Sequence, residues 1–358
     1  MLAASGMALV MAASGALGSP AIAGQRIGAN GSLGWLQLER QLGGFLPVGP
    51  LLSAWAGPNA IDTGSDGRLT ILLLGSDTRG SAVQRTDTIM IMSIKNGVIS
   101  AASIPRDTAR IANPDGGTFS DRINAILKLL KVGRTLDEAL AKFEIVIEKL
   151  LQIEIDYYAL IKFDGFNALV DEVDPITVSL PTAITDTRFW DNPNLPSGVY
   201  FPAASSYNLY AWQPNANPPL CNGLWKSKST PIAPQYWCQR ALPFVRSRKG
   251  TGNSDFVRAR RQQNFVVAAI TRVVNRGSGA ALSSLLGEAG DQVSGDQLVT
   301  DIPLTFADAL ELYNRLAGAS VGLQVVFKPQ DYATHIPGTT AYQLILPAVR
   351  QTTAQWFK

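Results

Sequence analysis

The stretch from Leu69 to Thr108 reads LTILLLGSDTRGSAVQRTDTIMIMSIKNGVISAASIPRDT. It contains three short apolar runs, which are Leu69–Leu74, Thr88–Ile94 and Val98–Ile104. Apolar runs of this length, bounded by glycine, asparagine and proline, are typical of buried strands joined by tight turns. The charged residues therefore fall at strand ends. Two aspartates and several arginines at one rim of a sheet predict a site for a phosphate and a metal ion.

The composition excludes several classes of function. The chain has 358 residues and a hydrophobic content of 46%, enough to bury the core of one large domain or two ordinary ones. Its charged fraction is 16% and its net charge is only +3, which argues against a general nucleic-acid binder. With one histidine, His335, and two cysteines, a histidine triad or a zinc site is nearly excluded. Catalysis must then depend on carboxylates, arginines, a metal ion or hydroxyl groups.

The N-terminus is a predicted targeting segment. Residues 1–24 contain no charged side chain, and they fit a secretory signal with an Ala-x-Ala site at 21–23 or an uncleaved membrane anchor. The later apolar runs are too short to span a bilayer. We therefore expect an exported protein that faces the outside of the cell, either anchored in the membrane or secreted to the envelope. Residues 25–67, rich in Gly, Pro, Asn and Ser, are predicted to form a linker.

Helical and strand patterns alternate after this stretch. The clearest helix is predicted over Leu136–Leu151, where Thr135 and Glu138 have the spacing of a capping box. Further helices are predicted at 122–131, 163–170 and 305–316, and further strands at 156–161, 176–180, 322–327 and 342–346. This alternation favours an α/β fold, with a central β-sheet sandwiched between helix layers.

Residues 182–241 differ from their surroundings. They are rich in proline and aromatic residues, show little periodicity, and are interpreted as a long insertion. In an exported protein, Cys221 and Cys238 are expected to form a disulfide that closes this segment.

A second charged stretch runs from Ala241 to Asn275. Phe244 and Val245 are predicted to belong to a strand, so that Arg246 and Arg248 point the same way. Ser254 is the predicted N-cap of a helix. Helical spacing places three polar residues on one face of it and a fourth beside them, which are Asp255, Arg258, Gln262 and Arg261.

Six motifs now occur in one order: GSDTRG, RTDTIMIMSI, SIPRDT, RINAI, DYYALIKFDGFNALVDEV, and RSR followed by SDFVRARRQQ. In this series the chain resembles the LytR-CpsA-Psr family of cell-envelope phosphotransferases. The resemblance covers about Leu69 to Val274, and a weaker similarity continues toward the C-terminus. It implies a mixed sheet between helix layers, with a hydrophobic tunnel that holds a polyprenyl chain.

Members of this family transfer a glycopolymer from a polyprenyl-pyrophosphate carrier to a peptidoglycan hydroxyl. The resemblance therefore implies Mg²⁺ (or Mn²⁺) as cofactor, with partners that are the lipid-linked glycopolymer, the peptidoglycan acceptor and the membrane, and no nucleic acid. Phosphoryl transfer needs mainly positioning and charge stabilisation, so the lack of a histidine or cysteine nucleophile is no obstacle.

The same resemblance assigns roles to residues. Asp77 and Asp87 match the metal-binding carboxylates. The pyrophosphate-binding set comprises Arg79, Arg85, Arg106, Arg122, Arg246, Arg248, Arg258, Arg261 and Gln262. Asp87, Arg106 and Asp107 are the expected catalytic residues, and either aspartate is a candidate for the base that accepts the hydroxyl proton.

The resemblance also sets the domain boundaries. Residues 68–275 are the expected catalytic core, and 276–358 the C-terminal part of the same domain. Since half of the predicted site lies at 77–107 and the other half at 246–262, the fold must bring Asp87 and Arg258 together. Two alternatives remain open, a prenyl-phosphate lipid-binding protein without activity and a transcriptional attenuator, although no helix-turn-helix pattern is evident.

Overall fold

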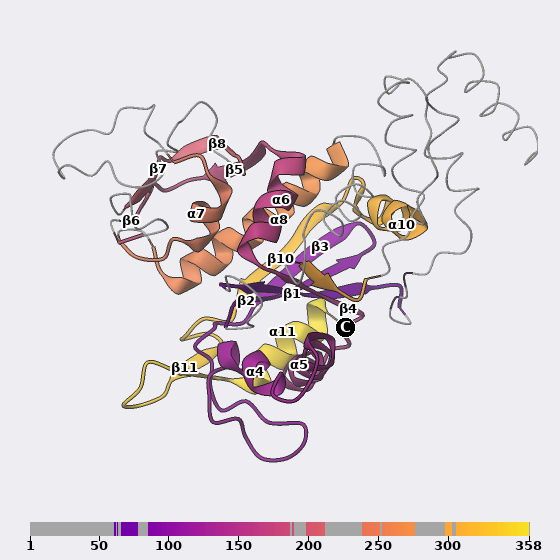
Figure 1. The fold of residues 1–358 in the computed structure, drawn as a ribbon, viewed down its shortest axis with the longest axis vertical. Helices are drawn as coiled ribbons and strands as arrows, with labels where there is room; N and C mark the ends of the chain where they lie inside the picture. The colour runs from indigo at the N-terminus through magenta and orange to yellow at the C-terminus, as the bar shows by residue number, and fades with distance from the viewer. Residues whose placement is uncertain are drawn as a thin grey trace, which may run out of the picture.

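A six-stranded mixed sheet lies at the centre of the computed structural model (Figure 1). The structure describes residues 61, 63, 66–77, 85–186, 188–189, 198–211, 238–250, 253–275, 298–302 and 306–357. The leader, most of the linker, Arg79 and Cys221 therefore lie outside the described residues, and what was predicted for them stays a prediction.

The order of the strands shows how the central sheet is built. The strands are β1 (Leu69–Ser76), β2 (Thr86–Lys95), β3 (Val98–Ser103), β4 (Tyr157–Ile161), β9 (Leu298–Thr300) and β10 (Ser320–Val326). They lie in the order β10-β3-β2-β1-β4-β9. Neighbours in β1–β2, β2–β3 and β4–β9 are antiparallel, whereas β1–β4 and β3–β10 are parallel. The predicted mixed sheet is confirmed, and β10 shows that the C-terminal segment completes it.

One face of the sheet is covered by α4 (Ile123–Leu130), α5 (Leu136–Leu151) and α11 (Leu346–Trp356), as Figure 1 shows. Phe143 and Ile147 of α5 are fully buried in the core of this face. The capping box is confirmed, because the Glu138 N–H donates to Thr135 Oγ1 at 3.2 Å and the Thr135 N–H donates to Glu138 Oε2 at 2.8 Å. We call this side of the sheet the α5 face.

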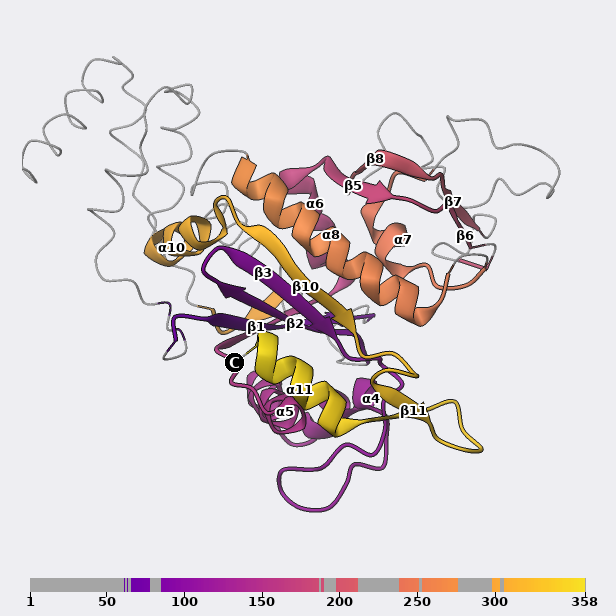
Figure 2. The same cartoon turned by 180° about the vertical axis from the view of Figure 1, so that it is seen from behind.

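The opposite face, here the α8 face, carries α6 (Phe163–Val173), α7 (Ala241–Arg246) and α8 (Asp255–Asn275), as the view from behind also shows (Figure 2). The apolar side chains of these helices pack with those of β1, β2 and β4 into a second buried cluster. Two residues of α10 (Phe306–Leu316), Leu312 and Leu316, belong to the same cluster.

Three pairs of short strands stand apart from the central sheet. They are β5 (Ile176–Leu180) with β8 (Ala204–Leu209), β6 (Ile184–Asp186) with β7 (Val199–Phe201), and β11 (Ala333–His335) with β12 (Tyr342–Leu344). The strand predicted at 176–180 exists, but it pairs with β8 outside the central sheet. The segment interpreted as an insertion therefore contributes strands, and Phe201 and Leu209 join the α8-face core.

Two local predictions are wrong. The strand predicted through Phe244 is the helix α7, six residues long with Pro243 in its first turn. Its first five residues are all buried, so it shows no amphipathic period that sequence reasoning can detect. The strand predicted to reach residue 346 ends at Leu344, and α11 begins at Leu346.

The part of the chain that the structure describes contains no helix long and apolar enough to cross a membrane.

The half-buried carboxyl group of Glu144 on α5 makes the stability of the fold depend on pH. Its neighbours include three acidic side chains, which are Asp301, Glu148 and Asp156. Burial, and next the charge of Asp301, raise the pKa of Glu144 from 4.5 to about 7. Because the folded state then binds the proton more tightly than the unfolded chain, stability is gained as the pH falls from 7 toward 4.5.

We expect Glu144→Gln to raise Tm at pH 8 and to leave it nearly unchanged at pH 5. At pH 8 the substitution removes an ionised, partly desolvated carboxylate, which is worth on the order of 1 kcal/mol after solvent screening. Thermal unfolding at the two pH values measures the effect, with Glu154→Gln at an exposed position as the matched control. An equal gain at both pH values would contradict this explanation.

Candidate functional site

Asp77 and Asp87 lie at the end of the β1–β2 pair. Asp77 directly follows β1, and Asp87 lies in β2. Gly75 pairs with Thr88 and Ser76 with Thr86, so Asp87 is the extra residue of a β-bulge. A Cβ atom on Gly75 would lie only 3.0 Å from the Thr88 Cβ, so glycine permits this close approach. A bulge redirects the side chain it carries, and here it directs the Asp87 carboxylate toward Arg106.

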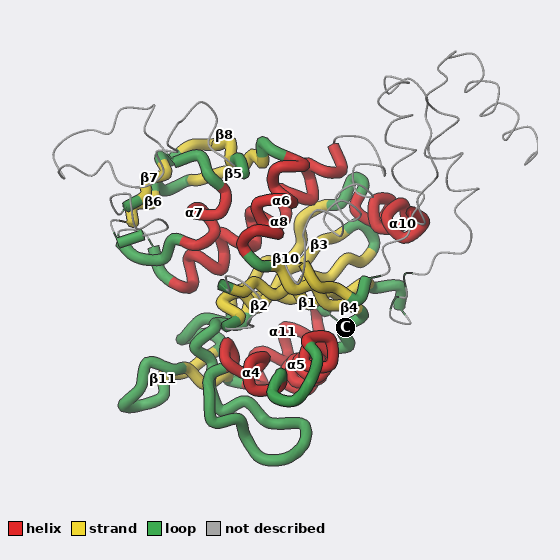
Figure 3. The backbone as a smooth tube through the Cα atoms, viewed as in Figure 1, coloured by secondary structure: helices red, strands yellow, loops and turns green. Residues whose placement is uncertain are grey.

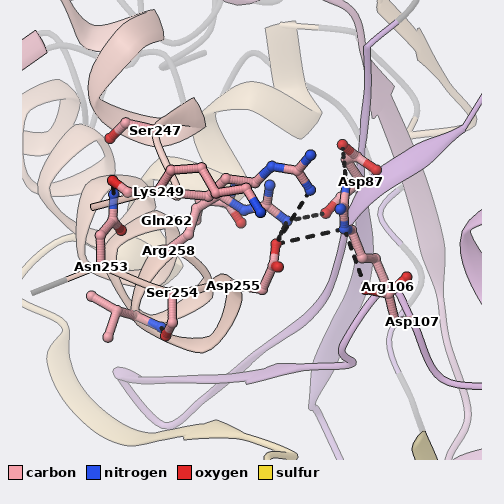
Figure 4. A network of polar contacts seen from close by, with 12 residues as sticks. Asp87, Arg106, Asp107, Ser247, Lys249, Asn253, Ser254, Asp255, Arg258 and Gln262 are labelled. Atoms are coloured by element: carbon pink, nitrogen blue, oxygen red, sulfur yellow. Dashed lines mark hydrogen bonds and ion pairs between the residues drawn. The ribbon is translucent and has the colours of Figure 1, made fainter. Parts of the chain in front are cut away.

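Arg106 connects three carboxylates. It follows β3 at the start of a connection to α4 that contains no helix or strand (Figure 3). Its Nη1 donates to Asp87 Oδ2 at 2.8 Å, and its Nε lies 3.8 Å from Asp107 Oδ2 and 3.5 Å from Asp255 Oδ1 (Figure 4). Desolvation opposes the charged form of this guanidinium, but the charges of Asp87 and Asp255 raise its pKa. Arg106 therefore stays a cation at the centre of the site.

The N-terminal turn of α8 brings the second charged stretch to the same place. Ser254 caps this helix as predicted, since the Val257 N–H donates to Ser254 Oγ at 3.1 Å. Arg258 Nη2 donates to the Asp87 carbonyl oxygen at 3.3 Å. The predicted approach of Asp87 and Arg258 is confirmed, although 171 residues separate them along the chain.

Asp255 lies among the arginines, and sequence reasoning gave it no role. Its Oδ1 is 3.0 Å from Arg258 Nη2, 3.5 Å from Arg106 Nε and 3.8 Å from Arg248 Nη1. This oxygen is buried and has no hydrogen-bond partner among the described residues. A carboxylate surrounded by guanidinium groups shows that the pocket between them accepts an anionic oxygen. The only signal in the sequence was the i,i+3 spacing of Asp255 and Arg258.

The loop that carries Arg248 is held by Asp186 of β6. Asp186 is buried, and its Oδ2 accepts the backbone N–H groups of Arg248 and Lys249, both at 2.9 Å. Gly250 continues the loop with φ +95, and a Cβ atom there would lie 2.0 Å from the Thr185 carbonyl oxygen. Only glycine fits this close approach of loop and strand. β6 therefore positions Arg248 beside Asp255.

Arg261 and Arg122 do not line the arginine-rich pocket between Asp87, Arg106 and Arg258, whereas Gln262 does. Arg261 is buried, and it donates to Ser247 Oγ at 3.1 Å and to Asn253 Oδ1 at 3.2 Å, so it braces the loop from inside. Arg122 Nη1 lies 2.5 Å from Asp107 Oδ1 and supports that carboxylate instead. Gln262 lines the pocket between Asp87 and Arg258 while its Nε2 donates to the Val245 carbonyl oxygen at 3.0 Å.

The two remaining arginines lie on the Asp77 side of the site. The Arg246 guanidinium stacks over the Phe163 ring, with its Cζ 4.0 Å from the ring centroid. Desolvation of the Asp77 carboxyl group raises its pKa overall, and the positive charge of Arg246 offsets a small part of that rise. Arg85 is exposed just before β2, and its backbone N–H group likewise offsets part of the rise in the pKa of Asp77. Both residues thus lie near the predicted metal ligand.

The acidic pair Asp77–Asp87 fits a divalent cation. Although Asp77 as a residue is exposed, partial desolvation of its carboxyl group, and next the charge of Asp87, raise its pKa. Two neighbouring carboxylates that repel each other are the oxygen ligands Mg²⁺ prefers. Within the described ranges no group of three or more His, Cys, Asp or Glu residues could hold a metal ion. An ion bound here would therefore take its other ligands from phosphate and water.

The fold and the site define an α/β protein with an arginine-rich anion site at one end of a mixed sheet. Residues 56–356 match the family model described as the LytR_cpsA_psr family, and the chain belongs to that family. This confirms the resemblance found in the sequence.

Several relatives have names that state an activity. The chain is 30% identical over 219 residues to the polyisoprenyl-teichoic acid–peptidoglycan teichoic acid transferase TagU of Bacillus mycoides (strain KBAB4), which covers 61% of this chain and 54% of that protein. It is 26% identical over 236 residues to TagV of Bacillus subtilis (strain 168), a transferase of the same name, covering 65% and 50%. The chain thus spans about half the length of the curated relatives it matches.

Solved structures share the fold. The crystal structure of B. subtilis TagV superposes with a TM-score of 0.56 and 22% identity, covering 81% of this chain and 97% of that one. A structure of TagT bound to LIIa-WTA superposes with a TM-score of 0.52 and 17% identity, covering 82% and 91%. The predicted fold class is therefore confirmed.

Proposed function

We propose that this protein is a magnesium-dependent phosphotransferase that moves a glycopolymer from a polyprenyl-pyrophosphate carrier to a peptidoglycan hydroxyl. The observation that carries this proposal is that Asp87, Arg106 and Arg258 meet around one arginine-rich pocket. Membership of a family whose named relatives transfer teichoic acid to peptidoglycan supports it. The uncharged leader supports export, which would place the site next to that acceptor.

The arginines of the site would bind the pyrophosphate. Guanidinium forks hold phosphate oxygens with two hydrogen bonds and keep their charge at any working pH. Arg106, Arg248 and Arg258 already surround the anionic oxygen of Asp255, so the donor phosphates would compete with Asp255 for the same cations. Mg²⁺ held by Asp77 and Asp87 would neutralise charge on the phosphates during transfer.

The reaction needs a proton acceptor and a leaving group. The acceptor hydroxyl oxygen forms a bond to the phosphorus that carries the glycan, and the bond from this phosphorus to the bridging oxygen breaks. The electron pair of that bond leaves with polyprenyl phosphate. The hydroxyl proton passes to a carboxylate of this chain, Asp87 or Asp107.

The polyprenyl chain would lie on the α8 face. There, apolar residues of α6 and α8 such as Phe166, Leu169, Val266 and Ile270 pack against the core while staying partly exposed. A partly exposed apolar surface of this kind can bury the hydrocarbon of a lipid chain. We therefore propose that the hydrophobic tunnel implied by the family resemblance lies on this face of the sheet.

Arg258→Ala is expected to lower the rate of polyprenyl phosphate release at least a hundredfold, because the side chain is only 7% exposed and faces both Asp87 and Asp255. The assay combines a lipid-pyrophosphate oligosaccharide, Mg²⁺ and peptidoglycan, with the lipid phosphate measured. Arg260→Ala, at an exposed position of the same helix, is the matched control and should stay within twofold of the wild type.

If the wild type binds the donor but releases no lipid phosphate, the chain is a lipid-binding protein instead of an enzyme. Salt-sensitive binding to DNA would favour the attenuator alternative. Equal rates for Arg258→Ala and Arg260→Ala would show that the phosphates do not bind in the arginine-rich pocket.

A further inference from the structure

Two cavities share one wall at the end of the sheet. The first is the arginine-rich pocket described above, whose lining includes Asp87, Arg258 and Gln262. The second has a volume of about 340 Å³, which is at the lower end of small-molecule sites. Four residues line both cavities, which are therefore adjacent, and these are Pro105, Arg106, Asp255 and Phe256. A transfer reaction needs two substrates whose reacting groups meet. Two adjacent cavities that share Arg106 allow a donor in one to meet an acceptor in the other.

The second cavity combines polar groups with an aromatic wall. Asp107, Lys249 and Asn253 offer a carboxylate, an ammonium and an amide. Phe256 and Tyr342 form the wall, with their ring centroids 5.6 Å apart and an interplanar angle of 67°. Hydrogen-bonding groups beside an aromatic ring suit a saccharide, whose hydroxyl groups need partners and whose C–H faces pack on a ring.

Tyr342 of the aromatic wall is hydrogen-bonded to the segment that carries Asp107, the predicted base. The Tyr342 N–H donates to the Asp107 carbonyl oxygen at 3.1 Å, and the Ala109 N–H donates to the Tyr342 carbonyl oxygen at 2.8 Å. Arg122 bridges the same two segments, since its Nη1 pairs with Asp107 and its Nη2 donates to Thr340 Oγ1 at 2.7 Å. The C-terminal β11–β12 hairpin is thereby fixed on the segment that carries Asp107, which keeps the ring and the carboxylate in one cavity.

We propose that this second cavity binds the saccharide unit of the acceptor, with the sugar ring against Tyr342 and the reacting hydroxyl at Asp107. This inference rests on the proposed phosphotransferase function and adds the place of the second substrate. Asp107 then takes the proton, and the hydroxyl oxygen approaches the donor phosphorus past Arg106, which lines both cavities. Arg122 is a positioning residue for Asp107.

Tyr342→Ala tests the proposal in the full-length protein. Soluble glycan fragments of peptidoglycan are the acceptor, and polyprenyl-pyrophosphate disaccharide with Mg²⁺ is the donor. We expect the acceptor KM to rise at least tenfold, while the donor KM and the hydrolysis of donor without acceptor stay within twofold. Tyr342→Phe keeps the ring and should behave like the wild type. Gln343→Ala, the next residue along β12 and absent from the cavity lining, is the matched control.

A second variant, outside the β11–β12 hairpin, tests the same cavity in case Tyr342→Ala disturbs the fold of the hairpin. Lys249 is exposed and has no ion-pair partner within the described ranges, so Lys249→Ala should fold normally and still raise the acceptor KM severalfold. An unchanged acceptor KM in both variants overturns the proposal. A rise in the donor KM instead also overturns it, because the cavity would then hold the sugar of the donor.

Binding measured without turnover separates this inference from the proposed function. If the wild type releases no lipid phosphate, the phosphotransferase function fails. Calorimetric titration of the same glycan fragments then decides about the cavity alone. Binding that weakens at least tenfold in Tyr342→Ala supports a saccharide site, and no binding to the wild type overturns it.

Discussion

Arg106→Ala is expected to lower the rate of lipid phosphate release at least a thousandfold, the largest effect of any single arginine. Arg106 pairs with Asp87 at 2.8 Å, approaches Asp107 and Asp255, and lines both cavities, whereas Arg258 lines only one. An arginine that stabilises the charge developing on a transferred phosphoryl group is worth 10³–10⁵ in rate. Without Arg106 the three neighbouring carboxylates would also lose a shared cation and repel an incoming phosphate.

Two further variants make this prediction specific. Arg106→Lys should recover less than a tenth of the activity, because an ammonium group cannot form the planar fork that contacts carboxylate and phosphate together. Arg110→Ala is the matched control, since Arg110 lies on the same connection, is exposed and donates to Gln343 Oε1 at 2.8 Å. The assigned role is wrong if folded Arg106→Ala keeps more than a tenth of the wild-type rate.

Local patterns were sufficient to predict much of the fold. The strands β1, β2 and β3 have continuous apolar runs and turn residues between them, and α5 has both a helical period and a capping box. In these segments the local preference and the tertiary structure agree, so the sequence alone predicts the element.

Other elements depend on contacts that no local pattern reports. α7 is short and its first five residues are buried, and burial on all sides removes the amphipathic signal that would distinguish it from a strand. β5 alternates buried and exposed residues as a strand should, but its sequence does not say that β8 is its partner. Strand pairing is decided by segments far along the chain, so topology is harder to predict than the element itself.

In the candidate site, too, local patterns predicted some features, whereas others depend on tertiary contacts. Helical spacing correctly placed Asp255, Arg258 and Gln262 on one face of α8. It could not show that the adjacent Arg261 would turn toward Ser247, because spacing defines a face and not the partners of a side chain. The bulge at Asp87 depends on the close contact of Gly75 with Thr88 across two strands, and it has no local signature.

Asp87→Asn is expected to reduce transfer by a factor similar to that of Arg106→Ala, and to remove the stabilisation of the protein by Mg²⁺. Asp87 is one carboxylate of the proposed metal pair and also the partner of Arg106. A ligand that binds only the folded state adds RT ln(1 + [L]/Kd), which is about 1.4 kcal/mol at ten times Kd. Thermal unfolding with and without Mg²⁺ measures this gain independently of activity, and Asp121→Asn at an exposed position is the matched control.

The raised pKa of Asp77 sets the sign of the pH dependence of this stabilisation. Because partial desolvation and the charge of Asp87 hold the pKa of Asp77 above 3.8, the carboxyl group is protonated in the folded state at a higher pH than in the unfolded chain. Above that pKa its ionised form destabilises the metal-free fold, and Mg²⁺ relieves the repulsion. The gain from Mg²⁺ should therefore be large at pH 7 and fade as the pH drops through the pKa of Asp77. Asp87→Asn removes one of the two proposed ligands, so a Mg²⁺-dependent shift of Tm that persisted at full size in this variant would place the metal ion elsewhere.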